Sequence, residues 1–105
     1  MRSCIKKAGS EAAITSQIRY VLRCADVFHW KQWQGLGSQA GVPDIIGVLN
    51  DGRFLAIEVK TEKGKVSPAQ QQFLDDVNLR GGLAFVARSI DDVIEKLNLK
   101  GFWRA

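Results

Sequence analysis

The sequence predicts an α/β fold in which a small mixed sheet is flanked by helices. One observation is the pair Asp51-Gly52 between two short apolar runs, the strongest short-range signal for a β-hairpin. A second is the apolar run at residues 83–87, which follows a helix-like segment and should pair in parallel with the strand before that segment. The chain has 105 residues, so a single domain over residues 1–105 is expected.

The composition is that of an ordinary globular protein. Apolar residues make up 46% and charged residues 25% of the chain. No apolar run approaches the ~20 residues that a membrane-spanning helix needs, and no repeat or secretory signal is visible, so no membrane partner is expected. The two cysteines, Cys4 and Cys24, lack metal or redox spacing, which favours reduced cytoplasmic thiols over a disulfide.

The first expected element is a helix from Ser10 to about Ala25, after a basic leader at residues 1–9. Ser10 is a good N-cap, and Glu11 is favoured in the first helical turn. The helical period gathers the apolar residues into one stripe, which consists of Ile14, Ile18, Val21 and Leu22. Glu11 projects onto this stripe, either as an acid that interacts with the helix dipole or as part of a functional site.

A short strand is expected next, at residues 27–31. Its alternation places Phe28 and Trp30 on one face. His29 is the only histidine, and no cysteine lies near it in metal-ligand spacing, so a surface position is expected rather than a metal site. Residues 32–41 should form a glycine-rich loop, which is either a plain connection or a segment that approaches a ligand closely.

The hairpin brings three charged residues to one end of the sheet. Asp44 begins its first strand, whereas Glu58 and Lys60 end its second. We expect a three-residue loop at residues 50–52 with a left-handed glycine, because this loop places all three charges on one face. A two-residue loop would place the two acids on opposite faces. The expected register sets Asp44 opposite Lys60.

Two adjacent carboxylates repel each other unless a cation lies between them. Mg²⁺ resolves this repulsion because it takes oxygen ligands from one or two carboxylates and keeps several waters. The carbonyl of Val59, between Glu58 and Lys60, could supply one more oxygen. Lys60 would then orient a water or hold a phosphate oxygen. Such a site suits attack of metal-activated water on a phosphodiester.

A second helix should begin at Ser67-Pro68. Ser67 is the N-cap, Pro68 is accepted at the first helical position, and Gln70 completes a capping box. Gln70 also lies on the apolar face of this helix and so points toward the sheet. Both a capping role and a role in the functional site are therefore open for Gln70.

The last third of the chain predicts one more strand and one more helix. The glycines at residues 81–82 end the second helix. The strand at residues 83–87 is almost wholly apolar, as expected for a central strand that is covered on both faces. Ser89 should cap a last helix that runs from residue 90 to about residue 98. The tail at residues 99–105 carries two aromatic side chains, which pack on their own core or on a partner.

Five short motifs follow one another between residues 11 and 87. They are the helix-borne Glu11, Gly-Val-Pro-Asp at 41–44, Glu-Val-Lys at 58–60, Ser-Pro-Ala-Gln at 67–70 and Gly-Gly-Leu-Ala-Phe-Val-Ala at 81–87. In this order they resemble the VRR-NUC domain family of the PD-(D/E)xK nuclease superfamily. The resemblance covers roughly residues 11–97. It implies a restriction-endonuclease-like αβββαβ core.

The resemblance also implies a metal-dependent DNA endonuclease that uses Mg²⁺ or Mn²⁺. The implied catalytic residues are Glu11, Asp44, Glu58, Lys60 and Gln70, and the implied metal ligands are Glu11, Asp44, Glu58 and the Val59 carbonyl. Stand-alone members of this size, from phages and bacteria, look like homodimers that act on branched DNA such as four-way (Holliday) junctions. This implies a homodimer in the cytoplasm of a bacterial or phage-infected cell.

Three lysines are expected to contact DNA, namely Lys31, Lys63 and Lys65. Lys31 and Trp33 border the glycine-rich loop, and the other two lysines follow the hairpin. The net charge is +4, and placing three acids and one lysine in a site leaves 14 basic and 8 acidic residues elsewhere, a bias toward polyanions. The alternative is an ordinary solvated, mildly basic surface.

Two other functions compete with the nuclease. One is a non-catalytic nucleic-acid-binding module on the same fold, and the other is a small assembly protein that uses the aromatic tail as its interface. The set of two acids and one lysine argues against the first, because a protein that only binds DNA gains nothing from acids that face phosphates. Because no helix carries a row of Arg and Asn suited to the major groove, recognition of DNA shape is expected rather than of sequence.

Overall fold

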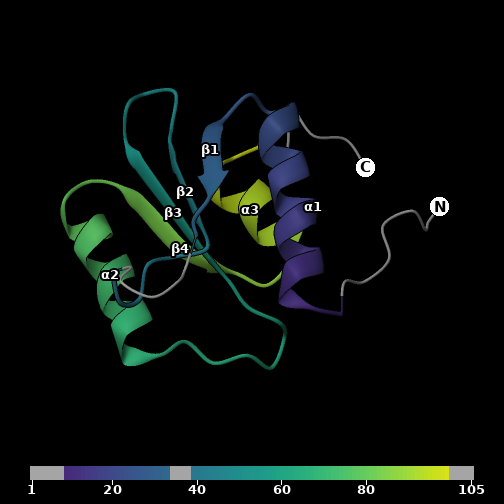
Figure 1. Ribbon diagram of the computed structural model, residues 1–105. Coiled ribbons are helices and arrows are strands. Elements are labelled where there is room, and N and C mark those ends of the chain that lie inside the picture. The colour runs from purple at the N-terminus through teal and green to yellow at the C-terminus, as the bar shows by residue number, and fades with distance from the viewer. Residues whose placement is uncertain (1–8, 34–38, 100–105) are drawn as a thin grey trace.

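The computed structural model describes residues 9–33 and 39–99, in which three helices flank a four-stranded sheet (Figure 1). The elements are α1 (Glu11–Cys24), β1 (Phe28–Lys31), β2 (Ile45–Val48), β3 (Phe54–Val59), α2 (Pro68–Leu79), β4 (Leu83–Ala87) and α3 (Ile90–Lys96). The predicted α/β fold with an αβββαβ core is therefore confirmed. Most of the expected leader and tail lies outside the described residues. Within the described ranges, no helix is long and apolar enough to cross a bilayer.

The sheet has the strand order β1-β2-β3-β4. The pairs β1–β2 and β2–β3 are antiparallel, and β3–β4 is parallel, as the crossover through α2 predicts. The expected central position of β4 is wrong, because β4 is an edge strand of the sheet that the structure describes. Its apolar sequence reflects helices on both of its faces, which an edge strand can also have.

The two faces of the sheet are covered by different helices. Figure 1 shows α1 and α3 on one side and α2 on the other. The α1/α3 side holds the larger core, formed by Ile14, Ile18, Leu22, Ile45, Leu55, Ile57, Val59, Phe85, Ala87 and Val93. The α2 side holds a smaller one, formed by Ile46, Ala56, Leu74 and Ala84. Because side chains alternate along a strand, Asp44 lies on the same side as Ile46, and Glu58 lies on the same side as Ala56. Both acids are therefore on the α2 side of the sheet.

The first helix matches its prediction closely. The Ser10 hydroxyl accepts a hydrogen bond from the Ala13 N–H at 3.1 Å, which caps α1. The whole predicted apolar stripe is buried. Glu11, however, is exposed, so its carboxylate does not share the burial of the stripe onto which it was expected to project. It lies in the first turn, ahead of the buried part of the helix.

The hairpin loop is the predicted three-residue loop, but its register differs from the expectation. Leu49 N–H donates to the Arg53 carbonyl at 2.8 Å, and Gly52 has a φ of +93°. Leu49 and Arg53 close the loop, and further along the hairpin Ile45 lies opposite Ile57. The next pair away from the loop therefore consists of Asp44 and Glu58, not of Asp44 and Lys60. This shift of two residues preserves side-chain parity, so the charges still share one face.

Three smaller expectations need correction. His29 is half-buried rather than on the surface, its Nδ1–H donates to the Val27 carbonyl at 2.8 Å, and burial lowers its pKa. Ser89 precedes α3 without a side-chain capping bond, and Asp92 in the first turn accepts from the Arg88 N–H at 2.8 Å. The helix ends at Lys96, earlier than expected. Cys24 is an exposed free thiol, whereas Cys4 lies outside the described residues.

Candidate active site

Asp44 directly precedes β2 and is held by backbone groups of both neighbouring strands. Its Oδ2 accepts a hydrogen bond from the Val59 N–H at 2.8 Å. Its carbonyl accepts from the Gln32 N–H at 2.7 Å. The carboxylate is therefore fixed against the end of β3, where Glu58 lies.

Glu58 is the most deeply buried charged residue of the site, with 2% of its surface exposed. Its Oε2 accepts from the Gln70 Nε2 at 3.1 Å and lies 3.7 Å from the Lys60 Nζ. Its Oε1 is buried and has no hydrogen-bond partner. Burial, together with the charge of Asp44, raises the pKa of Glu58 from its usual 4.5 to about 8, against the opposing effect of the Lys60 charge. Glu58 is thus a carboxyl group that resists ionisation.

Lys60 follows β3 directly and keeps its ammonium group beside the carboxyl pair. Its backbone N–H donates to the Ala87 carbonyl at 3.1 Å, which extends the pairing of β3 with β4. Only 12% of its side chain is exposed. The Arg88 guanidinium holds the segment after Lys60 by donating to the carbonyls of Thr61 at 2.6 Å and Gly64 at 2.8 Å. No local pattern in the sequence indicated this anchoring role of Arg88.

Gln70 makes the contacts that both of the roles left open by the sequence require. Its backbone N–H donates to the Ser67 hydroxyl at 3.1 Å, and its Oε1 accepts from the Ser67 N–H at 2.8 Å. Its Nε2 donates to Glu58 in addition. One end of the amide therefore closes the capping box of α2 while the other end enters the site.

Gly41 explains how the segment before Asp44 reaches α2. It has a φ of +77°, and a Cβ at this position would lie 2.4 Å from the Ala69 carbonyl oxygen. Only glycine allows such a close approach in this conformation. The sequence pattern contained this glycine, but the reason for it appears only in the structure.

Glu11 is not brought into contact with the other predicted site residues. It belongs to α1, on the opposite side of the sheet, and its charge contributes the smallest of the effects that raise the pKa of Glu58. Among the described residues, no group of three His, Cys, Asp or Glu side chains is arranged to hold a metal. The acidic part of the site therefore consists of Asp44 and Glu58, and the role of Glu11 stays a prediction.

The three lysines expected to contact DNA are exposed on two different segments. Lys31 ends β1 opposite Ile45, at the same end of the sheet as Asp44 but on the α1/α3 side. Lys63 and Lys65 lie between β3 and α2, shortly after Lys60. Their contacts with DNA remain predictions.

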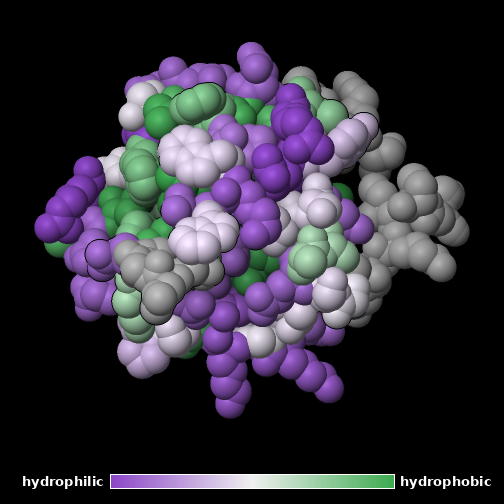
Figure 2. Space-filling model, viewed as in Figure 1, coloured by the Kyte–Doolittle hydropathy of each residue, from purple (hydrophilic) through white to green (hydrophobic). Residues whose placement is uncertain are grey.

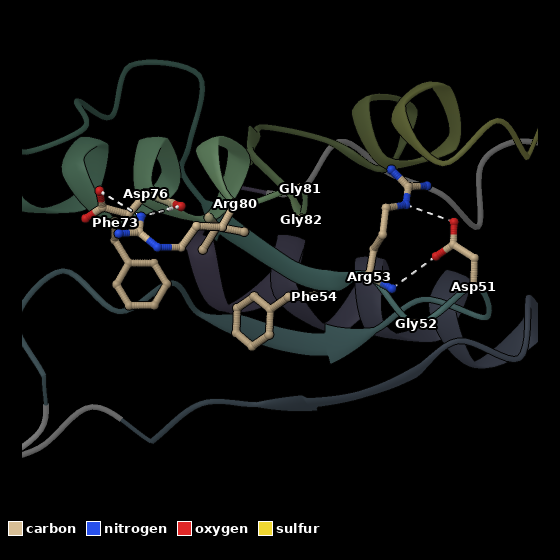
Figure 3. Close-up of a pocket in the computed structure, with 10 residues that line it drawn as sticks. Asp51, Gly52, Arg53, Phe54, Phe73, Asp76, Arg80, Gly81 and Gly82 are labelled. Atoms are coloured by element: carbon tan, nitrogen blue, oxygen red, sulfur yellow. Dashed lines mark hydrogen bonds and ion pairs between the residues drawn. The ribbon is translucent and has the colours of Figure 1, made fainter.

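A cleft of about 550 Å³ lies at the start of β3, whereas Glu58 lies near its end. Figure 3 shows the residues that line this cleft. It is lined by the hairpin loop and the C-terminal half of α2: Asp51, Gly52, Arg53, Phe54, Phe73, Asp76, Val77, Arg80, Gly81 and Gly82. It contains none of the predicted catalytic residues, so the candidate active site is the carboxyl pair and not this cleft.

The carboxyl pair fits a hard divalent cation. Asp44 and Glu58 lie together although each would be negative at neutral pH in water, and one buried oxygen of Glu58 has no hydrogen-bond partner. Oxygen ligands from one or two carboxylates are the usual protein contribution to a Mg²⁺ site. The residues that could hold such an ion are therefore Asp44 and Glu58.

Comparisons with known proteins identify the family and the fold of the chain. The family model of the VRR-NUC domain matches residues 4–91. A solved structure described as a VRR_NUC domain protein is 23% identical, with 88% of each chain covered and a TM-score of 0.69. Another, described as a VRR_NUC domain, is 21% identical, with 92% of this chain and 100% of the other covered and a TM-score of 0.68. No curated protein matches the chain. At these identities the two structures show the shared fold, while the match to the family model over most of the chain shows that it belongs to the VRR-NUC family of nuclease-type domains.

Proposed function

We propose that this chain is a divalent-metal-dependent DNA endonuclease that hydrolyses phosphodiester bonds. Its proposed active site consists of Asp44, Glu58, Lys60 and Gln70. The observation that carries the proposal is the environment of Glu58. This buried carboxyl group adjoins a second one, is held by an amide and lies 3.7 Å from an ammonium group. A fold without a charged ligand or substrate to bind would gain no stability from this combination.

Asp44 and Glu58 would hold Mg²⁺ or Mn²⁺, together with the Val59 carbonyl and Glu11. The ion would supply Lewis acidity and would lower the pKa of a water bound to it. The Val59 N–H fixes one oxygen of Asp44, and the Gln70 amide fixes one oxygen of Glu58. These two hydrogen bonds hold the carboxylates in place before a ligand arrives, so little reorganisation is needed.

Lys60 supplies the positive charge that the reaction needs. Its ammonium group carries three donors, of which one faces Glu58 and the others can reach a phosphate oxygen or the attacking water. Negative charge grows on the phosphate oxygens as the water attacks, and a fixed cation stabilises that charge. Lys60 is therefore the residue whose loss should affect the chemical step more than the binding of metal.

The proposed substrate is branched DNA such as a four-way junction, cut by a homodimer. This part is supported by the resemblance to stand-alone nucleases of similar size, and by the excess of basic residues outside the site. A two-fold symmetric dimer would present two sites for paired cuts. Lys31, Lys63 and Lys65 are the proposed backbone contacts, since all three are exposed.

The test is cleavage of a labelled four-way junction beside linear duplex, single-stranded and flap DNA, each in Mg²⁺, Mn²⁺ or EDTA. The proposal predicts metal-dependent cuts, placed symmetrically in the junction and weak in linear duplex. The Lys60→Ala variant, purified in the same way, controls for a contaminating nuclease. Binding of DNA without cleavage in either metal would contradict the proposal and favour a non-catalytic module.

A further inference from the structure

The α2 side of the sheet carries exposed aromatic side chains beside the candidate active site. α2 packs on β3 and β4, through the smaller core. Phe28 and Trp30 on β1 and Phe54 on β3 remain exposed by 67%, 41% and 41%. Figure 2 shows pale and green side chains over the region of β1, among hydrophilic ones. This surface is therefore not the hydrophilic one expected of a free sheet face.

The strand register aligns these aromatic residues with the acids. Phe28 lies opposite Val48, which in turn lies opposite Phe54. Trp30 lies in the next row, opposite Ile46. The following row of the same face contains Gln32 beside Asp44, as the hydrogen bond between their backbones shows, with Glu58 next to Asp44. Successive rows on one face are about 7 Å apart, so Trp30 is one row from the acids.

Hydrogen bonds connect Trp30 to the residue that positions Asp44. The Trp30 Nε1–H donates to the Gln32 Oε1 at 3.2 Å, and the Gln32 backbone N–H donates to the Asp44 carbonyl. The Phe28 ring lies 5.7 Å from the Trp30 ring at an interplanar angle of 63°. The indole is thus held by Gln32 and by an edge-to-face contact with Phe28, while 41% of Trp30 stays exposed to a ligand.

We propose that Trp30 and Phe28 form a stacking site for an unpaired base of the DNA strand that is cut at Asp44 and Glu58. The inference rests on the proposed nuclease function. One nucleotide spans the distance between a phosphate at the acids and a base on Trp30. Every base has a flat face, so stacking on an aromatic side chain requires no particular sequence. Bases inside a duplex are already stacked, so this site selects branched DNA whose nucleotides at the branch point are unpaired or open on binding.

The cleft at the start of β3 extends this surface away from the acids. Phe54 lines the cleft, and in Figure 3 its ring and that of Phe73 project to the same side of β3 and α2. Arg53 and Arg80 border it, with 50% and 71% of their side chains exposed. Each arginine is paired with an acid that also lines the cleft, Asp51 at 2.9 Å and Asp76 at 3.6 Å, so the cleft suits a further base rather than its phosphate. This continuity favours a nucleic-acid strand over a second copy of the chain as the occupant.

The experiment couples a change in the protein to a change in the DNA. Binding is measured in EDTA, to prevent cleavage, for wild type, Trp30→Leu, Trp30→Phe and the control Tyr20→Leu. Tyr20 is also exposed, by 56%, but lies on α1. The ligands are linear duplex, a flap with normal unpaired nucleotides, and the same flap with abasic nucleotides next to the cut position. Thermal unfolding of each variant checks the fold.

The stacking site predicts about tenfold weaker binding of the normal flap by Trp30→Leu, with little change for duplex. Trp30→Phe should keep most of the affinity, and Tyr20→Leu all of it. Abasic nucleotides should weaken the binding of the flap by wild type by a similar factor. They should not weaken further the binding of the flap by Trp30→Leu. The abasic flap tests the inference on wild-type protein, so it does not depend on the folding of a variant.

Two results would overturn the inference. If abasic and normal flaps bind wild type equally while the enzyme still cuts junctions, the nuclease stands and the stacking site fails. If sedimentation shows that Trp30→Leu converts a dimer to a monomer with unchanged dependence on the base, the surface is a contact between copies. Failure of wild type to bind or cut any DNA would remove both this inference and the proposed function.

Discussion

Glu58 is the residue whose environment departs furthest from that of a free side chain. Its carboxyl group is buried next to Asp44, and the rise of its pKa to about 8 means that the metal-free protein holds a proton there at neutral pH. Neighbouring carboxyl groups that share a site titrate as a pair. A divalent cation would take the place of the proton, so metal binding should be accompanied by proton release.

The raised pKa predicts how the stability of the metal-free protein depends on pH. The unfolded chain loses the Glu58 proton near pH 4.5, whereas the folded chain keeps it to about pH 8. The unfolding free energy should therefore fall between these two pH values, because the unfolded state binds fewer protons there. Urea unfolding in EDTA at pH 5 and pH 8 measures this loss for wild type and Glu58→Gln.

The Glu58→Gln variant is neutral at every pH and serves as the reference for all other titrating groups. Its advantage in stability over wild type should grow from pH 5 to pH 8. Addition of Mg²⁺ at pH 8 should stabilise wild type but not the variant, because the ion binds the ionised pair. Parallel stability profiles for the two proteins would contradict the assignment of the raised pKa to Glu58.

Substitutions at Ser67 and Gln70 distinguish the capping of α2 from a contribution of Gln70 to cleavage. Ser67→Ala removes the capping bond from the Gln70 N–H and should cost about 1 kcal/mol of stability, with cleavage little changed. Gln70→Ala removes the return bond to Ser67 and the contact with Glu58 as well. It should cost a similar amount of stability and slow cleavage about tenfold or more. Thermal unfolding and single-turnover cleavage measure the two effects. Equal cleavage by both variants would assign Gln70 to capping alone.

At the scale of elements, two glycines set the positions of the segments that carry the site. Gly52 allows the hairpin loop, and Gly41 allows the segment before Asp44 to approach the start of α2. Both have positive φ, but a Cβ at Gly52 would meet nothing within 4 Å, whereas one at Gly41 would lie 2.4 Å from the Ala69 carbonyl oxygen. The two positions thus share the backbone requirement and differ only in the steric one.

This difference predicts unequal effects of two matched substitutions. Gly52→Ala should cost about 1–2 kcal/mol, the penalty of a left-handed non-glycine residue. Gly41→Ala adds the clash with Ala69 and should cost clearly more, while it shifts Asp44 relative to Gln70. Urea unfolding gives the first comparison, and cleavage per folded molecule gives the second. An equal loss of stability in both variants would show that the contact with α2 is not a constraint.

Local signals predicted most of these elements because each signal acts over a few residues. The capping of α1 by Ser10, the loop at Gly52 and the capping box of α2 all follow from the chemistry of single turns. The expected register was off by two residues through a miscount, because a loop at residues 50–52 already makes Leu49 and Arg53 the closing pair and sets Asp44 beside Glu58. Parity alone was sufficient to bring Asp44 and Glu58 together.

Features that depend on long-range packing were beyond the sequence. The edge position of β4 depends on which strand pairs with β3, and an apolar run reports only that both faces are covered. Two contacts join segments far apart in the chain: Arg88 anchors residues 61–64, and Gly41 closely approaches α2. The exposure of Glu11 likewise depends on how α1 packs on the sheet. The aromatic surface at Trp30 can be recognised only once it is known that α2 packs on β3 and β4 and how β1 pairs with β2.

At the scale of the whole molecule, the fold places two acids that could bind a metal ion, Asp44 and Glu58, at one end of a sheet. Exposed aromatic side chains lie beside them. α1 and α3 supply the main core on the opposite side of the sheet, and α2 packs on the smaller core on this side. The central claim is that Asp44 and Glu58 hold the ion while Lys60 acts on the phosphate or the water. These two roles can be separated, because the first requires carboxylates and the second a cation.

The most direct measurement pairs calorimetric Mn²⁺ binding with single-turnover cleavage of a four-way junction, for wild type, Asp44→Ala, Lys60→Ala and the exposed control Lys96→Ala. The account predicts that Lys60→Ala binds Mn²⁺ but cleaves at least about a hundredfold more slowly. Asp44→Ala should lose both properties, and Lys96→Ala should resemble wild type. Cleavage by Lys60→Ala at the wild-type rate, or cleavage by wild type in EDTA, would contradict the account.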